Sequence, residues 1–322
     1  MIMKMNDFAA ARKTNPIKPR QTRSEALAGR TYSTAVIAPD VNNSNWGIFD
    51  GTAFTGVFDG NDHKITGLTI DDGGAGNWYL GLLGCINGGE VRNLALEGGS
   101  GSGYRFVGAL VGANWGSVSN CYSTGDVNGG QYVGGLVGYG GMIWNCYSTG
   151  NVNGIAWVGG LVGKNAGGII SNCYSTGSVS GTGSYVGGLL GETFLGIVSN
   201  CYSIGDVSGT TDSIGGLVGY NNDASVSDSF WDTDTQTHGI TASIGHNEGT
   251  ATNVASLPTT LMQTKSTFTS AGWDFVEIWL INEGATYPVL RQEIRSDLNG
   301  DGGVDLLDFA IFADHWLEGR GN

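Results

Sequence analysis

Charged residues are scarce in this 322-residue chain. They make up 14% of it, roughly half of the ~25% that is usual in globular domains. Acidic residues outnumber basic ones by 29 to 15, and between Arg105 and Lys265 the only basic residue is Lys164. A nucleic-acid surface needs clustered cations that displace phosphate counterions. We therefore expect no nucleic-acid partner.

Long apolar runs are also missing. No segment approaches the ~18–20 apolar residues that are needed to span a membrane, so no membrane span is expected. Residues 1–30 hold seven of the fifteen basic residues, but no apolar segment follows them as a secretory signal requires. We expect a basic, disordered N-terminal segment and a true start that lies elsewhere.

The usual signatures of catalytic and zinc sites are absent. The sequence has no Cys-x-x-Cys pair and no His-Glu-x-x-His motif. Asp126 and Asp206 share a position in the repeat described below but lie three repeats apart, about 14 Å at a strand spacing of ~4.8 Å. Paired glycosidase carboxylates are ~5–9.5 Å apart. We therefore predict no catalytic residues and a chain that is not an enzyme.

Glycine and an internal repeat are what the chain has in abundance. Glycine supplies 57 residues, about 18% against a usual ~7%. The string Asn-Cys-Tyr-Ser-Thr-Gly occurs at 120–125, 145–150 and 172–177, and again at 200–205 with Ile204 in place of Thr. Leu68 and Leu94 are expected to precede this series and Ser229 to follow it, which makes seven repeats.

A second motif keeps the same period. Val-Gly-Gly-Leu-Val-Gly occurs at 133–138 and 158–163, with variants at 107–112, 186–191 and 214–219. Each repeat thus holds short β segments separated by turn residues, and such segments bury their apolar faces only by stacking on their neighbours. The predicted fold is all-β, a parallel β-helix or β-solenoid of about seven rungs, roughly 34 Å long at ~4.8 Å per rung.

Two residues of the first motif have opposite predicted orientations. Its cysteines should form an inward ladder of buried free thiols, because stacked side chains orient poorly for disulfides. The adjacent tyrosines should face the other side of the strand. An exposed aromatic stripe there would be a candidate ligand site, and a ladder of mutually shielding rings is the alternative. The stripe consists of Tyr122, Tyr147, Tyr174 and Tyr202.

These motifs resemble the GLUG repeat family across about residues 53–235. Asp59-Gly60-Asn61-Asp62-His63 looks like the opening turn of that family. The resemblance implies a parallel β-helical module in an extracellular or cell-surface setting, and it implies no particular ligand. We place the solenoid at 31–235 and, because 236–291 is aromatic and non-repetitive, a C-terminal cap there.

The last segment, 292–322, carries an acidic loop. Oxygen-bearing side chains occupy loop positions 1, 3, 5, 9 and 12. A glycine at position 6 permits the sharp turn, and the residue at position 7 would supply its backbone carbonyl. This pattern predicts Ca²⁺ binding. The segment after it has apolar residues at helical spacing. The predicted ligands are Asp297, Asn299, Asp301, Gly303 (by its carbonyl), Asp305 and Asp308.

This loop and helix resemble one dockerin repeat. The resemblance implies docking onto a cohesin-type protein, although a full type I dockerin has two such segments and this chain shows one. A calcium-stabilised terminal cap is the alternative.

Three functions remain open from the sequence. The preferred hypothesis is a secreted or surface-displayed, non-catalytic solenoid for adhesion or polysaccharide contact, attached to a larger assembly by the dockerin-like tail. The second is a structural rod or self-associating filament subunit. The third is a β-helical polysaccharide-degrading enzyme.

Overall fold

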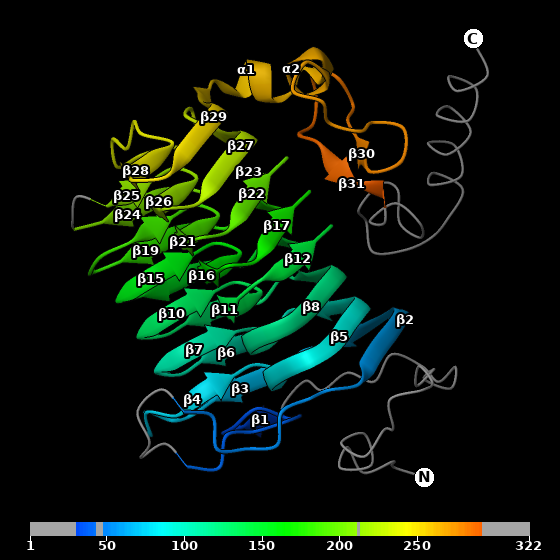
Figure 1. Cartoon of the computed structure of the whole chain (residues 1–322), viewed down its shortest axis with the longest axis vertical. Helices are drawn as coiled ribbons and strands as arrows, with labels where there is room; N and C mark the ends of the chain where they lie inside the picture. The colour runs from blue at the N-terminus through cyan, green and yellow to red at the C-terminus, as the bar shows by residue number, and fades with distance from the viewer. Residues whose placement is uncertain (1–29, 43–47, 211–212, 292–322) are drawn as a thin grey trace. The chain divides into compact units, whose positions relative to one another are not determined.

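The structure is a computed structural model that describes residues 30–42, 48–210 and 213–291. The chain divides into two compact units, Met1–Thr259 and Thr260–Asn322. In the first unit the strands are parallel, and they stack in chain order from β2 to β29 (Figure 1). The predicted fold class is confirmed, because these strands form a parallel β-solenoid of about seven turns.

Three sheets run along the stack in the described part of the chain. The first contains β1 (Thr31–Tyr32), β3 (Thr69–Asp71), β6 (Ser100–Ser102), β9 (Asp126–Asn128), β14 (Val152–Gly154), β19 (Val179–Gly181) and β24 (Val207–Gly209). The second contains β4 (Trp78–Leu80), β7 (Arg105–Gly108), β10 (Gln131–Gly134), β15 (Ala156–Gly159), β20 (Val186–Gly187) and β25 (Ile214–Gly215).

The third sheet is the largest, because its early strands are long and its later turns divide into separate strands. It begins with β2 (Val57–Thr66), β5 (Leu83–Glu97) and β8 (Val111–Ser123). Three columns continue it: β11 (Val137–Gly140), β16 (Val162–Ala166), β21 (Leu190–Phe194), β26 (Val218–Asn222) and β28 (Ile244–Asn247); β12 (Met142–Trp144), β17 (Ile169–Ser171), β22 (Ile197–Ser199), β27 (Ser225–Asp232) and β29 (Thr250–Leu257); and β13 (Tyr147–Ser148), β18 (Tyr174–Ser175) and β23 (Tyr202–Ser203).

The core is a set of apolar ladders. The Leu of each glycine motif is fully buried, as are the flanking valines, and equivalent residues pair in register from turn to turn. Val133, for example, lies between Val107 and Val158. Because each turn that carries the glycine motif buries the same apolar positions against the next one, the stack is stable where a single turn would not be.

The two repeated motifs contact each other across the interior. Ser123 donates a hydrogen bond of 2.6 Å to the carbonyl of Gly135, and Ser203 makes the same bond to Gly216. A Cβ at Gly135 would lie 2.2 Å from the Oγ of Ser148 and 2.2 Å from the carbonyl oxygen of Gly160. The glycine is therefore required by the close approach of the serine ladder, which explains why both motifs keep one period.

The stack continues past the boundary that the sequence predicts. Strands β28 and β29 pair in parallel with β26 and β27, so residues 244–257 add to the sheet, and the boundary expected at 235 lies inside it. This turn lacks both repeat motifs, but backbone pairing does not depend on them. Asn253 still adopts the left-handed conformation (φ 54°) of the repeat asparagines.

The first predicted repeat also needs a correction. Leu94 pairs with Cys121 as expected, but the residue opposite Leu94 on the preceding turn is His63, not Leu68. A register shift between Asp59 and His63 separates β2 from the regular pattern. Leu68 is buried in the core from another position.

The second unit is described over residues 260–291. Two short helices, α1 (Thr259–Met262) and α2 (Lys265–Thr269), precede an antiparallel pair, β30 (Trp279–Leu280) and β31 (Val289–Leu290). Its small core contains Phe268, Trp273 and Trp279, which are at most 3% exposed, and their rings pack with centroids 4.6–4.7 Å apart. The aromatic character of this segment therefore serves a core of its own.

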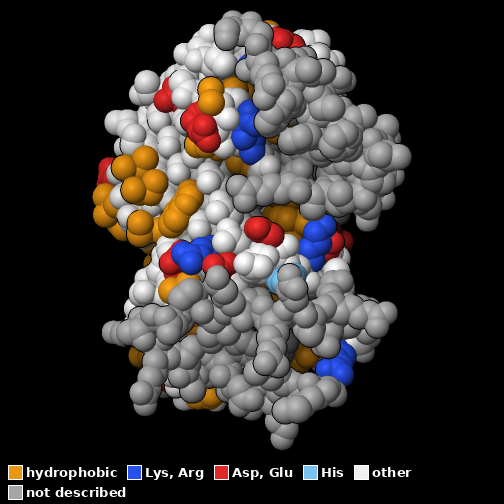
Figure 2. All heavy atoms as spheres, turned by 90° about the vertical axis from the view of Figure 1, so that its right-hand side faces the viewer, with side chains coloured by type: hydrophobic (Ala, Val, Ile, Leu, Met, Phe, Trp, Pro, Cys, Tyr) orange, Lys and Arg blue, Asp and Glu red, His pale blue; other side chains and the backbone are white. Residues whose placement is uncertain are grey.

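One outer face of the solenoid exposes apolar side chains. Strands β12, β17 and β22 lie on the right-hand side of Figure 1, the side that faces the viewer in Figure 2, and hydrophobic side chains gather there. Met142, Ile169 and Ile197 occupy equivalent outward positions of these strands. No helix in the described ranges combines the length and hydropathy that crossing a bilayer requires.

Candidate binding surface

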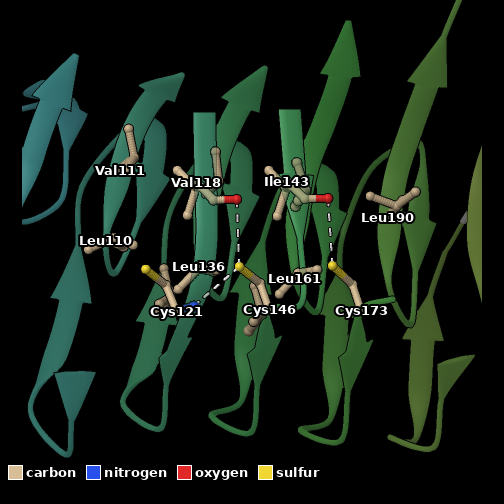
Figure 3. Close-up of a cluster of buried hydrophobic side chains, with 14 of the residues drawn as sticks. Leu110, Val111, Val118, Cys121, Leu136, Ile143, Cys146, Leu161, Cys173 and Leu190 are labelled. Atoms are coloured by element: carbon tan, nitrogen blue, oxygen red, sulfur yellow. Dashed lines mark hydrogen bonds between the residues drawn. The ribbon is translucent and has the colours of Figure 1, made fainter. Parts of the chain in front are cut away.

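The cysteine ladder has the predicted inward orientation. All five cysteines are free and buried, and Cys121, Cys146 and Cys173 lie among the core side chains (Figure 3). The thiol of Cys146 donates to the carbonyl of Val118 at 3.8 Å, and that of Cys173 to Ile143 at 3.8 Å. Burial raises the pKa of the Cys121 thiol to about 12. These thiols are therefore packing groups and poor nucleophiles.

The tyrosines next to the cysteines do not form an exposed stripe, which was one of the two arrangements that the sequence left open. Tyr147, Tyr174 and Tyr202 are 8%, 4% and 1% exposed, and only Tyr122 is partly exposed. Their rings stack in sequence with centroids 4.5–4.9 Å apart and interplanar angles of 2–10°. They form the alternative, a ladder of mutually shielding rings, because the strand spacing matches ring stacking.

A second aromatic ladder occupies a corner of the solenoid. We call it the aromatic corner, and it consists of Tyr79, Phe106, Tyr132, Trp157 and Tyr185. Its first four rings stack with centroids 4.6–4.9 Å apart, and the fifth is tilted by 43° at 5.4 Å. Exposure rises along it, from buried Tyr79 and Phe106 to partly exposed Tyr132, Trp157 and Tyr185. This corner therefore presents aromatic edges to solvent.

Every residue of the aromatic corner has a left-handed backbone. The φ angles are 55° for the first four and 67° for Tyr185. Bulky side chains rarely adopt this conformation, which costs about 1–2 kcal/mol per residue. The repeat asparagines that precede the cysteines use the same conformation at φ 51–54°, but asparagine tolerates it better. Five strained aromatics in register point to a role for the corner beyond turning the chain.

One further ring, Tyr139, crosses the ladder, and a second, Trp115, lies against Tyr139. Tyr139 lies with its centroid 5.5 Å from Phe106 and 5.7 Å from Tyr132, at interplanar angles of 81° and 86°. Trp115 contacts Tyr139 at 6.3 Å and is 49% exposed. Within the ladder the ring faces are covered by one another, so stacking on a ligand needs rings of another orientation. Trp115 and Tyr139 provide them.

A buried carboxylate anchors the corner. Glu192 is 3% exposed and accepts three hydrogen bonds or ion contacts: from the indole N–H of Trp157 at 2.5 Å, from the Nζ of Lys164 at 2.9 Å and from the amide of Asn222 at 3.2 Å. Lys164 is also 5.3 Å from the ring of Phe194. The pKa of Tyr139 is raised by burial and by the nearby Tyr132 and Glu192. Its hydroxyl therefore stays protonated and able to donate.

The aromatic corner was missed in the sequence, although the signal is present. An aromatic residue precedes four of the five glycine motifs, at Phe106, Tyr132, Trp157 and Tyr185, whereas Ser213 precedes the fifth. Tyr79 holds the same position, because Leu80 pairs with Val107. A residue next to an inward valine on a strand is expected to point outward, and five aromatics at the repeat period predict a ladder.

Asp126 and Asp206, the two acids considered for catalysis, accept hydrogen bonds from backbone N–H groups. Asp126 accepts a hydrogen bond from the backbone N–H of Asn151 at 2.8 Å, and Asp206 accepts one from Thr237 at 3.0 Å. Asn151 and Ser178 occupy the same position on the two turns between Asp126 and Asp206. The two carboxylates are therefore three turns apart, as the repeat predicts. Among the described residues, no three His, Cys, Asp or Glu side chains gather where a metal ion could bind.

The six predicted calcium ligands lie outside the described residues. Asp297, Asn299, Asp301, Gly303, Asp305 and Asp308 belong to the segment 292–322. Calcium binding there stays a prediction from the sequence, as does the dockerin-like character of the segment.

Four of the five turns that carry the aromatic corner match a known motif, and the turn of Tyr79 lies outside the matched segments. Four segments, 104–128, 129–153, 158–180 and 182–208, match the GLUG motif. The chain carries GLUG repeats. They begin at or near Phe106, Tyr132, Trp157 and Tyr185, so the corner is built by the repeated turns themselves.

Two known proteins are similar to parts of this GLUG-repeat chain. Over 87 residues, 27% of this chain, it is 39% identical to halomucin of Haloquadratum walsbyi (strain DSM 16790 / HBSQ001), and the match spans 1% of that protein. The fold resembles the crystal structure of a Bacteroides ovatus protein named as a putative immunoglobulin A1 protease, with a TM-score of 0.52 and 21% identity over 77% of this chain and 83% of that one. At this identity the likeness concerns the fold alone.

Proposed function

We propose that this chain is an extracellular, non-catalytic β-solenoid that contacts carbohydrate through the aromatic corner and its crossing rings. The observation that carries the proposal is the exposed indole of Trp115 beside Tyr139, which contacts a ladder of five residues that all have a left-handed backbone. Exposed aromatic rings beside fixed polar groups are typical of sites that stack on sugar rings and orient their hydroxyls. The GLUG motifs and the similarity to halomucin support an extracellular setting.

Attachment to a larger assembly is the second part of the proposal. The loop at 297–308 has calcium-ligand spacing and resembles a dockerin repeat, so it would hold the solenoid to a cohesin-type partner when Ca²⁺ is bound. The solenoid would then act as the contact module and the tail as its anchor.

Affinity electrophoresis of the full chain tests the contact function. The protein is run through gels that contain a panel of polysaccharides, and we expect retardation by at least one of them. Trp115→Ala and Tyr139→Ala should lose that retardation, because each removes a crossing ring. Ile155→Ala is the matched control, since Ile155 is also 49% exposed but lies between β14 and β15.

Two outcomes would reject this function. Mobility that no polysaccharide changes would remove the carbohydrate proposal and favour the structural rod, which the in-register stacking of all described turns also suits. Retardation that Trp115→Ala and Tyr139→Ala leave unchanged would place the contact elsewhere on the chain.

A further inference from the structure

An exposed apolar patch lies on the third sheet, away from the ladder of the aromatic corner. It consists of Met142, Ile169, Leu195 and Ile197, which are 49%, 44%, 60% and 47% exposed. Met142, Ile169 and Ile197 lie side by side in register on the neighbouring strands β12, β17 and β22. They therefore form a straight ridge with the spacing of the strands. We call these four residues the apolar patch.

Leu195 is unfavourable at its position for two reasons, its exposure to solvent and its backbone conformation. It is the most exposed member of the patch, and its backbone is left-handed with φ 52°. The equivalent corner residues of the neighbouring turns are Gly167 (φ 73°) and Asp223 (φ 51°), which suit this conformation or solvent better. A leucine here is strained and mostly exposed, which favours a role in contact with something outside the solenoid.

Charge is sparse around the ridge formed by Met142, Ile169 and Ile197, and the exception beside Leu195 is Asp223 on the next turn. The ridge is preceded in register by Ser117 and followed by Ser225, and the adjacent outward column holds Trp144, Ser171 and Ser199. The chain as a whole has a formal net charge of −14. Two copies of such an acidic molecule repel each other over most of their surfaces. Along the ridge itself, whose register neighbours are Ser117 and Ser225, two copies can approach closely without pairing like charges.

The shape of the patch is also self-complementary. A two-fold axis over Ile169 would place that residue against itself and Met142 of each copy against Ile197 of the other. Ridges with the same strand spacing pack as two sheet faces about 10 Å apart.

We propose that the apolar patch is the contact surface of a weak dimer formed by two copies of this chain. The exposed parts of four aliphatic side chains amount to roughly 400 Å², within the range of functional patches on monomers. This area is below the ~800 Å² per partner of a standard interface, so the dimer dissociates on dilution. Its formation strengthens as salt screens the repulsion between the acidic chains.

Sedimentation velocity of the full chain at rising concentration tests this. The wild type should shift from monomer to dimer, and the shift should occur at lower concentration when the salt concentration is raised. Ile169→Lys and Ile197→Lys should raise the dissociation constant at least about tenfold, because each buries a charge in the interface. Ile155→Lys is the control, since it adds the same charge at an equally exposed isoleucine on another face.

Three results would overturn the proposal. The first is a wild type that stays monomeric at every accessible concentration. The second is a dimer that Ile169→Lys and Ile197→Lys leave intact. The third is an Ile155→Lys variant that loses dimerisation to the same extent as these two. The melting temperature of each variant shows that it is folded, and an exposed Ile169 predicts little change. Polysaccharide retardation of the same variants shows whether the two surfaces are independent.

Discussion

The indole N–H of Trp157 donates a hydrogen bond of 2.5 Å to the carboxylate of Glu192, which belongs to the next turn of the solenoid. The same carboxylate contacts Lys164 at 2.9 Å. One buried acid thus connects the corner ladder with the only basic residue of its region. The arrangement fixes the orientation of the indole. Three donors, from Trp157, Lys164 and Asn222, share this one carboxylate.

Glu192→Ala should therefore destabilise the solenoid strongly. It leaves the ammonium of Lys164, whose side chain is 19% exposed, and the indole N–H of Trp157 without their acceptor. We expect a loss of about 2–4 kcal/mol in the free energy of unfolding, measured by urea denaturation. The double variant Lys164→Met/Glu192→Leu should recover much of this loss. Equal urea midpoints for Glu192→Ala and wild type would contradict the assignment.

Gly101→Ala should stabilise the protein. Gly101 is buried, pairs in register with Ile70 and Val127 on inward positions, and borders a small apolar cavity near Leu80. A new methyl would lie 3.7–3.8 Å from Val127, which is ordinary contact. We expect a gain of about 1 kcal/mol, seen as a higher melting temperature.

Gly135→Ala is the opposite case and serves as the control. Its Cβ would lie 2.2 Å from the carbonyl oxygen of Gly160, so the stack must shift and stability should fall by about 1–3 kcal/mol. If both alanines lower the melting temperature, the space beside Gly101 is not usable.

Stability should fall as the pH rises above 9. Burial raises the pKa of Cys121 from 9.0 to about 12, and it also raises those of Cys146 and Cys173. Above pH 9 the unfolded chain releases these protons while the folded chain retains them, so alkali favours unfolding. Each thiol should contribute about 1.4 kcal/mol per pH unit in that range.

Urea denaturation between about pH 8 and 11 measures this slope. Cys121→Ala should be less stable at pH 8, because it leaves a cavity, but its slope should be smaller by one proton. An unchanged slope would mean that the thiol already ionises in the folded state.

Calcium should bind to the C-terminal segment and not to the solenoid. Isothermal titration of the full chain should detect Ca²⁺ binding, and Asp297→Ala or Asp308→Ala should weaken it at least about tenfold, because each removes a charged ligand. Asp126→Ala is the control, since Asp126 caps a backbone N–H in the solenoid. Calcium binding that survives both tail variants would move the site elsewhere.

The sequence predicts most of the backbone and little of the surface. The period of Cys121 and its equivalents sets the turn, and the glycine motif sets the inward valines, because both follow from what can be buried in a stack. The burial of Tyr147, next to Cys146, cannot be predicted from the repeat period and the glycine motif. A residue that points away from one strand face can still be buried, which strand alternation alone does not predict.

The end of the stack was also beyond prediction from the motifs. Residues 250–257 pair through backbone groups and carry only Asn253 as a trace of the repeat. The apolar patch exists because certain turns have an aliphatic residue at a position where neighbouring turns have serine or glycine. Such single exceptions are visible in the sequence only after the register is known.

Unequal spacing of the cysteines shows where this architecture accepts change. The intervals are 25, 27 and 28 residues, yet Ile143 still pairs with Ile170 and Val158 with Val186. The additional residues fall at two corners, where 167–168 separate β16 from β17 and 182–185 separate β19 from β20. Peptides inserted at these corners would leave the core ladders untouched, so the solenoid is a frame on which surface loops can diversify turn by turn.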